Sequence, residues 1–369
     1  IKLKNTTKSL HTRVDVSKAY PAATPIYQNS AFEAQSDFFY SRKNNPNVQE
    51  FEEAVGHMEG SKFGIATTTG MSAINLVLSL LKPNQTIVIN KLIYGCTFKY
   101  FEWFSENYNC NLIIEDLSSD FLAEKYSADL VFFETPTNPF LKTVDINIVS
   151  NHYKKLNSNC IVVVDNTWAS PLYQSPCNLG ADISLHSATK YISGHSDVMG
   201  GVILTNDLKI DELIRTRRFY TGANLDPHSA WLLRRSLHTL DIRLEKQGKT
   251  TKKIISFLET RNEIEKVYYP VIDGIQMVDY ATLLFFDFRK DLVSKYSIFS
   301  QKLQLFSTGT GMACVTSMVA QPFTGSHASM DSTEKENMGL SLSTIRLSFG
   351  LEDPNDLIID IENALKALV

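Results

Sequence analysis

One lysine lies in a stretch whose composition suits covalent chemistry. Residues 187–190 read SATK and follow a short, apolar-leaning run, residues 182–186, that predicts a strand. An amine on a rigid turn at a strand end can bond to a carbonyl carbon if a partly desolvated pocket keeps it neutral. Ser187 and Thr189 flank Lys190 with hydroxyls, which suit phosphate oxygens. Alternatively, Lys190 is an ordinary surface lysine, and this stretch alone leaves both interpretations open.

A carboxylate, Asp165, is the second candidate, because it ends the β-branched run of residues 161–164. Such a run predicts a buried parallel strand, and open α/β sheets bind ligands at the carboxyl ends of their strands. Pyridoxal phosphate needs an acid at such a place to hold its ring nitrogen protonated. The gap between Asp165 and Lys190 leaves room for one crossover and one more strand. Taken alone, Asp165 could also be a turn-forming residue.

Eight motifs occur along the chain in a specific order. They are TPIYQNSAF (from Thr24), YSRKNNPNV (Tyr40), TTTGMSAI (Thr67), YGCTF (Tyr94), ETPTNP (Glu134), VDNTWASP (Val164), SATKYISGHSDVMGG (Ser187) and IRLSFGLED (Ile345). Together they resemble the Cys/Met-metabolism pyridoxal-phosphate enzymes, a fold type I family that includes cystathionine γ-synthase, the cystathionine lyases and methionine γ-lyase. Any one motif is weak evidence, whereas eight in order are specific.

The resemblance implies a site for pyridoxal 5'-phosphate. Lys190 would hold the cofactor, Asp165 would keep the ring nitrogen protonated, and Tyr94 would stack on the ring and exchange protons with the substrate. These three form the expected catalytic set. Gly70 and Met71 would bind the phosphate through free N–H groups at the start of an apolar helix. The expected cofactor-binding residues are Tyr40, Arg42, Gly70, Met71, Tyr94, Asn138, Asp165, Thr167, Ser187, Thr189 and Lys190.

Several of these residues also have simpler interpretations. The stretch before the helix could be an ordinary cap, and Tyr94 could be a core tyrosine. Asn138 would face the phenolic oxygen of the cofactor, but Asn-Pro pairs also start turns. Tyr40 and Arg42 match residues that bind the cofactor phosphate of a neighbouring subunit, although Arg42 could also be a surface residue. The resemblance therefore implies a homodimer with shared sites, assembled into a family-like tetramer.

The substrate is expected to be an amino acid bound by Arg346, Asn138, Thr310, Gly311 and Cys96. Arg346 matches the clamp for the α-carboxylate, and an arginine between apolar residues is costly to bury unless it is paired. Thr310 and Gly311 stand where the family often has glutamate and serine, which predicts a remodelled pocket. Cys96 resembles methionine γ-lyase, but Arg218-Phe219 replaces the Lys-Asp pair of that enzyme. Cys96 could therefore also be a small buried residue.

Composition limits the classes of partner. The formal net charge is −4, from 36 basic and 40 acidic residues, which argues against nucleic acid or an anionic membrane. The basic group at Arg215, Arg217 and Arg218 is interpreted as a solvated helix face. Five cysteines without a C-x-x-C pair argue against a disulfide framework or metal site and favour the cytoplasm. No run of ~18 apolar residues and no apolar signal core occurs, which argues against membrane insertion.

The pattern of elements predicts an α/β fold in two domains, since 369 residues are too many for one core. Fold type I implies a mostly parallel seven-stranded sheet with helices on both faces. Predicted strands are 86–90, 111–115, 130–134, 161–165, 182–186, 202–205 and 283–288. Predicted helices are 47–57, 72–81, 97–107, 146–156, a long helix 230–247 and one from 354. We expect an arm (1–45), a cofactor domain (46–247) and a smaller C-terminal α/β domain (248–369).

The expected function is elimination or replacement at Cγ of an amino acid such as an activated homoserine, cystathionine or a methionine-like substrate. The sequence does not choose between elimination and replacement, and a β-eliminating cystathionine or cysteine lyase is an alternative. A cofactor-binding regulator without turnover is a second class of function, but the presence of Lys190, Asp165, Tyr94 and Arg346 argues against it. A nicotinamide oxidoreductase is disfavoured because no G-x-G-x-x-G follows a strand.

Overall fold

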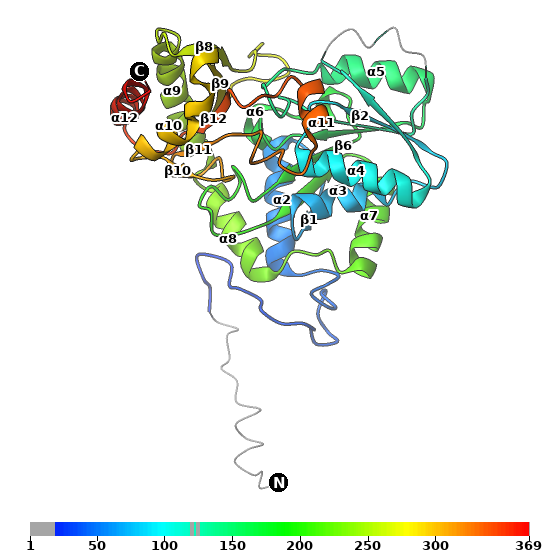
Figure 1. The fold of residues 1–369 in the computed structure, drawn as a ribbon. Helices are drawn as coiled ribbons and strands as arrows, with labels where there is room; N and C mark the ends of the chain where they lie inside the picture. Colours follow the sequence, from blue (N-terminus) through cyan, green and yellow to red (C-terminus); the bar gives the residue numbers. More distant parts are fainter. Residues whose placement is uncertain (1–18, 119–121, 123–125, 369) are drawn as a thin grey trace.

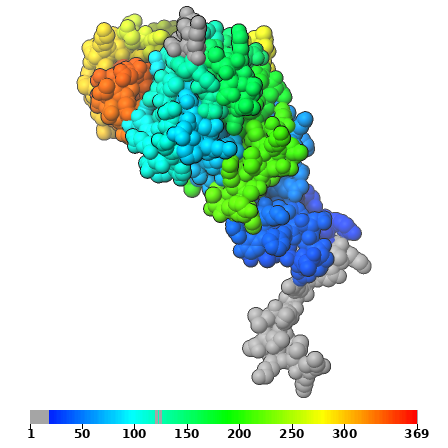
Figure 2. Space-filling model, turned by 90° about the vertical axis from the view of Figure 1, so that its right-hand side faces the viewer, coloured from blue at the N-terminus to red at the C-terminus, as the bar shows by residue number. Residues whose placement is uncertain are grey.

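The computed structural model describes residues 19–118, 122 and 126–368 and contains two β-sheets with helices around them. Strands β8–β12 lie with α9, α10 and α12 on one side, and the larger sheet occupies the other side (Figure 1). The part of the expected arm before residue 19 lies outside the described residues. Residues 19–45 carry no helix, and Figure 2 shows this segment projecting from the body of the molecule.

The larger sheet has seven strands in the order β1-β7-β6-β5-β4-β2-β3. Their bounds are Phe63–Thr67 (β1), Thr86–Asn90 (β2), Asn111–Glu115 (β3), Leu130–Glu134 (β4), Ile161–Asp165 (β5), Ile183–Ser187 (β6) and Gly201–Thr205 (β7). Strand β7 is antiparallel to both neighbours, whereas β2–β6 pair in parallel. The expected fold class is therefore confirmed. The sequence reading omitted β1.

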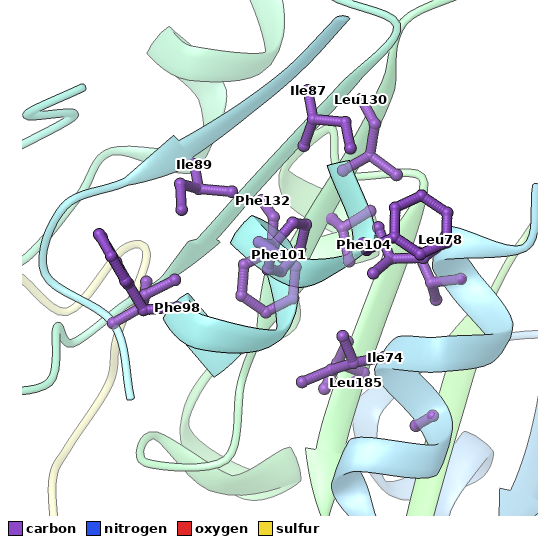
Figure 3. Close-up of a cluster of buried hydrophobic side chains, with 14 of the residues drawn as sticks. Ile74, Leu78, Ile87, Ile89, Phe98, Phe101, Phe104, Leu130, Phe132 and Leu185 are labelled. Atoms are coloured by element: carbon purple, nitrogen blue, oxygen red, sulfur yellow. The ribbon is translucent and has the colours of Figure 1, made fainter. Parts of the chain in front are cut away.

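Helices pack on both faces of this sheet. They are α2 (Pro46–Glu59), α3 (Gly70–Leu78), α4 (Gly95–Tyr108), α5 (Ile146–Leu156), α6 (Ser170–Tyr173), α7 (Leu208–Thr221) and α8 (Pro227–Leu237), with the 3₁₀ turn η2 (Pro176–Leu179). Alternate side chains of a strand point to opposite faces. Phe132 accordingly packs with α3 and α4 on one face, beside Phe101 (Figure 3). The centres of the two rings lie 5.0 Å apart. Its neighbours Val131 and Phe133 pack with α5 on the other face.

The smaller sheet has the order β10-β11-β12-β9-β8. Its strands are Ile264–Tyr268 (β8), Leu283–Phe288 (β9), Ser307–Thr308 (β10), Met318–Ala320 (β11) and Thr344–Ser348 (β12). The accompanying helices are α9 (Leu240–Leu258), α10 (Tyr296–Lys302), α11 (Ser332–Asn337) and α12 (Pro354–Lys366), with the 3₁₀ helix η3 (Lys290–Lys295). Asp353 caps α12 by accepting a hydrogen bond of 2.8 Å from the amide of Asn355, with Pro354 at the first helical position as predicted.

The prediction of one long helix over 230–247 is wrong. Helix α8 ends at Leu237, and α9 begins at Leu240. The buried guanidinium of Arg243 donates to the carbonyl oxygens of Ser236 and Tyr191, at 3.1 and 2.8 Å. Arg243 therefore satisfies the carbonyl oxygen of Ser236 at the end of α8. The sequence between α8 and α9 contains neither proline nor glycine, so no residue type there indicates the break. Because α9 runs to Leu258, the domain boundary expected at 247 falls inside a helix.

The interpretation of the basic group on α7 as a solvated face is wrong for two of its three arginines. Arg218 is only 3% exposed, and both Arg215 and Arg218 form ion pairs with the buried carboxylate of Glu52 on α2. Burial raises the pKa of Glu52, but the two arginines outweigh it and hold the pKa below its usual value. Arg215 and Arg218 therefore connect α7 to α2 through Glu52, and to the edge strand β1 through the carbonyl oxygens of Gly64 and Ala66.

Candidate active site

A cavity of about 240 Å³ opens at the carboxyl ends of the parallel strands. It is lined by Thr69, Gly70, Met71, Ile74, Tyr94, Thr97, Glu134, Asn138, Asp165, Thr167, Trp168, Ser187, Thr189, Lys190, Met199, Thr310, Met312, Ser326 and Arg346. Strands β4, β5 and β6 each contribute their last residue, because parallel strands end at the same edge of a sheet. The smaller sheet contributes Arg346 from β12.

Lys190 lies on the turn that follows β6, where its amide donates to the carbonyl of Ser187 at 3.1 Å. The amide of Gly194 donates to the carbonyl of Lys190 at 2.8 Å, so both peptide groups of the lysine are held. Burial lowers the pKa of Lys190, and the positive charge of Arg346 lowers it further. The amine is thereby biased toward the neutral form that a nucleophile or a base requires.

The start of α3 and the end of β6 form one wall of the cavity. Thr69 caps α3, since its hydroxyl accepts a hydrogen bond of 3.0 Å from the amide of Ser72. The first amides of a helix have no partner inside it and suit an anion. A Cβ at Gly70 would lie 3.0 Å from the Cβ of Ser187, so a side chain at Gly70 would close this space. The hydroxyl of Thr189 contacts the amide of Gly200 at 3.1 Å.

Two carboxyl groups meet inside the cavity, and sequence reasoning identified only one of them. Asp165 and Glu134 are register partners at the ends of β5 and β4. One oxygen of Glu134 accepts a hydrogen bond of 2.7 Å from the amide of Tyr94, while its other oxygen is buried without a hydrogen-bond partner among the described residues. Burial raises the pKa of both groups, and the charge of Asp165 raises that of Glu134 further. The ETPTNP motif contained this signal, a strand ending in glutamate.

Thr167 and Asn138 lie beside this pair. The carboxylate of Asp165 accepts a hydrogen bond of 3.0 Å from the amide of Thr167, whose hydroxyl accepts one of 2.8 Å from the amide of Ser187. Thr167 therefore connects β5 to the turn that carries the lysine. The side-chain oxygen of Asn138 is buried and has no hydrogen-bond partner among the described residues, which leaves it available to a ligand in the cavity.

Tyr94 precedes α4 and is one of the residues that line the cavity. Burial, the hydrogen bond from Cys96 and the nearby charge of Glu134 raise the pKa of Tyr94 to about 12, so its phenol keeps its proton at neutral pH. The thiol of Cys96 donates to the phenol oxygen at 3.3 Å. Cys96 is exposed and is not among the lining residues, so its interpretation as a small buried residue is wrong.

Arg346 reaches the cavity from β12 and is 3% exposed. Its guanidinium donates to the backbone oxygens of Thr310 and Gly311, at 3.1 and 2.9 Å, and approaches the sulfur of Met312 at 3.4 Å. Within the described part of the chain it forms no ion pair, so a carboxylate from a ligand could complete its coordination. Burial lowers its pKa to about 10, and nearby tyrosines offset part of that effect.

The two substrate-pocket residues that depart from the family differ in geometry. Thr310 lines the cavity with an exposed side chain, whereas Gly311 contributes only its carbonyl, to Arg346. A Cβ at Gly311 would lie 2.5 Å from the sulfur of Met318, so a serine there would displace that side chain. Sequence reasoning missed Met312, which follows them, as well as Met199 and Trp168, which lie within matched motifs, and Ser326, which lies in none of them.

Tyr40 and Arg42 lie outside the cavity of their own chain. The guanidinium of Arg42 sits 4.6 Å from the ring centre of Phe219 and donates to the carbonyl oxygen of that residue at 3.0 Å. Neither Tyr40 nor Arg42 lines the cavity.

The residues present fit pyridoxal phosphate. A half-buried lysine biased toward its neutral form, a half-buried aspartate and a helix start with glycine offer the three groups that its aldehyde, ring nitrogen and phosphate need. The unpaired buried oxygen of Asn138 supplies a polar atom that such a ligand would satisfy. The described residues also contain no helix with the length and apolar character that crossing a membrane requires.

Comparisons with known proteins agree with this geometry. The family model for Cys/Met metabolism PLP-dependent enzymes matches residues 5–366. The chain is 34% identical to cystathionine beta-lyase of Lactococcus lactis subsp. cremoris across 98% of both proteins. It is 35% identical to cystathionine gamma-lyase of Dictyostelium discoideum, covering 93% of this chain and 91% of the relative. Cystathionine gamma synthase from Xanthomonas oryzae pv. oryzae, solved with aminoacrylate and cysteine, superposes with a TM-score of 0.91 at 31% identity, covering 100% of this chain and 99% of the other.

Proposed function

This chain belongs to the Cys/Met metabolism family of PLP-dependent enzymes, and we propose that the cavity around Lys190 is its active site. The protein is an enzyme that uses pyridoxal 5'-phosphate for γ-elimination or γ-replacement on an amino acid with a leaving group at Cγ. The observation that carries the site assignment is the convergence of Lys190, Asp165 and Arg346 on one cavity. These residues come from β5, from the turn after β6 and from the smaller sheet.

In the proposed arrangement, Lys190 holds the cofactor covalently and Asp165 binds its ring nitrogen. Gly70, Met71, Ser187 and Thr189 would bind the phosphate, Tyr94 would pack on the ring and Asn138 would bind the phenolic oxygen. The amide of Thr167 donates to Asp165 and would keep it in place. The bound cofactor supplies an electron sink for the negative charge that develops at Cα of the substrate. One side-chain oxygen of Asn138 and one of Glu134 have no hydrogen-bond partner among the described residues, which leaves both available to a ligand.

The protein groups then divide the proton transfers. Arg346 binds the α-carboxylate and orients the substrate, because its guanidinium lacks an ion-pair partner among the described residues. The amine of Lys190, whose pKa burial lowers, would be released from the cofactor when the substrate amine takes its place, and would then accept the proton from Cα and return protons to the carbon skeleton. Tyr94 keeps its proton at neutral pH and can donate it to the leaving group. Asp165 stabilises positive charge at the ring nitrogen.

A product screen tests this function. Purified, cofactor-loaded protein is incubated with O-acylhomoserines, cystathionine, methionine and cysteine, with and without thiols, and the products are identified. We expect keto acid with ammonia, or a thioether product, from a γ-substituted amino acid. Turnover restricted to β-substituted substrates would favour the β-elimination alternative, which the name of the Lactococcus relative supports. Cofactor binding without any turnover would favour a regulator.

The assembly and location of the protein are also part of the proposal. Tyr40 and Arg42 lie outside the cavity of their own chain, which supports a homodimer with shared sites and, within it, a family-like tetramer. All five cysteines are free, which supports a reducing cytoplasmic location. Residues 1–45 are proposed to form an arm that contacts the neighbouring subunit, residues 46–247 the cofactor domain and residues 248–369 the smaller domain.

A further inference from the structure

We infer that a buried hydrogen-bond network behind the cavity positions Asp165 and the turn that carries Lys190. The side chains of Glu59, His186 and Asn166 form this network, and none of the three lines the cavity. The inference rests on the proposed function and gives it positioning residues that act through their neighbours. Three features carry it: the place of the network in the sheet, its reach across three strand ends and its burial.

Two network residues are the direct chain neighbours of residues that line the cavity. His186 precedes Ser187 in β6. Asn166 follows Asp165, the last residue of β5. Successive side chains of an extended chain point to opposite faces of a sheet, and only Ser187 and Asp165 line the cavity. The side chains of His186 and Asn166 therefore lie behind the wall that their neighbours form.

Glu59, the last residue of α2, joins these two strands. One oxygen of its carboxylate lies 2.5 Å from Nε2 of His186. The same oxygen accepts a hydrogen bond of 3.0 Å from the side-chain amide of Asn166. A single carboxylate oxygen thus connects the ends of β5 and β6 to each other and to α2.

Gln174 extends the network to a third strand. Its side-chain amide donates to the side-chain oxygen of Asn166 and to the carbonyl oxygen of Thr135, both at 2.8 Å. Thr135 follows Glu134, which ends β4 and lines the cavity. The ends of β4, β5 and β6 are therefore connected by side chains as well as by the backbone hydrogen bonds of the sheet.

The burial of the network argues that packing alone does not explain it. Glu59 and His186 are each 1% exposed, and the second oxygen of Glu59 has no hydrogen-bond partner among the described residues. A buried pair of this kind contributes little to stability, because desolvation offsets its attraction, and apolar residues of similar size often serve a core as well. A role in placing the neighbouring cavity residues accounts for a polar group in this position.

The network also acts on the charge of Asp165. Burial raises the pKa of Asp165, whereas the hydrogen bonds from Thr167 and the charge of His186 lower it. His186 therefore lies within electrostatic reach of the carboxylate although it is on the other side of the wall. The proposed function requires Asp165 in fixed contact with the ring nitrogen, and a misplacement of about 1 Å can lower a rate by ~100-fold.

Two substitutions at His186 test the inference. His186→Gln keeps an N–H group that can donate to Glu59, whereas His186→Leu removes every hydrogen bond of this side chain. Cofactor-free protein is titrated with pyridoxal 5'-phosphate, and the visible absorbance gives the dissociation constant. Steady-state kinetics are then measured with the amino acid that the product screen identifies.

The two variants should differ in a defined way. We expect His186→Leu to weaken cofactor binding and to lower kcat by at least ~10-fold each, because Asp165 and the lysine turn lose their support. The KM for the amino acid should change by less than ~2-fold, since Arg346 is untouched. His186→Gln should keep both the dissociation constant and kcat within ~3-fold of wild type, because the hydrogen bond to Glu59 is retained.

Asp360→Asn is the matched control for a general loss of stability. Asp360 on α12 is 8% exposed, does not line the cavity and accepts hydrogen bonds from the amides of Gln304 and Leu305. This variant should unfold more easily and still keep cofactor binding and kcat within ~2-fold of wild type. Losses of cofactor affinity that follow the loss of stability equally in Asp360→Asn and His186→Leu would overturn the inference.

A double variant, Glu59→Leu with His186→Leu, is prepared in parallel. It leaves no charged group without its partner, so it should fold even where His186→Leu alone does not. Wild-type cofactor affinity and kcat in either folded variant would overturn the inference and leave the proposed function standing. Wild-type protein that does not bind pyridoxal 5'-phosphate would instead refute the proposed function and the inference with it.

Discussion

Glu134 and Asp165 are register partners at the ends of the adjacent parallel strands β4 and β5, and both carboxyl groups lie inside the cavity. Glu134 also accepts a hydrogen bond from the amide of Tyr94. This one residue therefore connects the proposed ring-nitrogen ligand to the proposed stacking residue. Its remaining oxygen has no hydrogen-bond partner among the described residues, and burial together with the charge of Asp165 raises the pKa of Glu134.

The first prediction concerns the pH dependence of stability. Burial and the charge of Asp165 raise the pKa of Glu134 well above 4.5 in the folded protein. The stability that this group contributes is therefore full below its unfolded pKa and is lost as pH rises through the folded pKa. In cofactor-free wild-type protein, the free energy of unfolding should therefore fall as the pH rises above 4.5. Glu134→Gln removes the titrating group, so this fall should become shallower, by at most ~1.4 kcal/mol per pH unit.

Denaturant unfolding at a series of pH values measures this effect. Glu53→Gln on α2 is the control, because Glu53 is exposed and should follow the wild-type curve. Superimposable curves for wild type and Glu134→Gln would show that the folded environment does not hold a proton on Glu134.

The second prediction concerns Asp165. Asp165→Asn should still bind the cofactor and show its visible absorbance, since Lys190 and the phosphate-binding residues are unchanged. It should lose at least ~100-fold in kcat, because a neutral amide cannot hold the ring nitrogen protonated. The measurement is steady-state kinetics alongside an absorbance spectrum. A wild-type rate in the variant would refute the proposed role of Asp165.

The third prediction concerns sharing of sites between subunits. Lys190→Ala should lose the visible absorbance of the bound cofactor together with all turnover, and Arg42→Ala should be nearly inactive. Refolding the two inactive variants together should restore part of the activity, because one site of each mixed dimer receives both wild-type residues. Lys209→Ala, an exposed lysine on α7, is the control for the loss of a lysine. Proven mixed dimers without activity would mean that each site is built from one chain.

The fourth prediction separates substrate choice from carboxylate binding. Thr310→Glu, alone or with Gly311→Ser, should change the ranking of γ-substituted amino acids by ~10-fold or more in kcat/KM while leaving the cofactor spectrum unchanged. The Gly311→Ser change requires Met318 to move, since the new Cβ would lie 2.5 Å from its sulfur. The single variant is therefore the cleaner test.

Arg346→Ala should behave differently from the Thr310 variants. Every α-amino acid carries the carboxylate that Arg346 is proposed to bind, so all substrates should lose kcat/KM by a similar factor. A changed ranking in Arg346→Ala, together with an unchanged ranking in Thr310→Glu, would mean that the two roles are reversed.

Local sequence was sufficient for the central strands and for the turn that carries the lysine. The strands β2 to β5 have the bounds that their apolar runs predict, and Asp165 ends β5 as expected. Lys190 follows its strand on a turn, and Asp353 with Pro354 starts α12. These features depend on side-chain type, strand period and capping, which act over a few neighbouring residues.

Only the tertiary structure decided which distant residues meet. Glu134 faces Asp165 because β4 pairs with β5, and Arg218 is buried because Glu52 lies opposite it on α2. The break between α8 and α9 also involves a distant contact, since Arg243 on α9 binds both the carbonyl oxygen of Ser236 before the break and that of Tyr191 in a distant segment. A sequence motif specifies which side chains are available. Strand order and packing determine how far apart those side chains lie, and these distances set the pKa values of the groups in the cavity and thereby its chemistry.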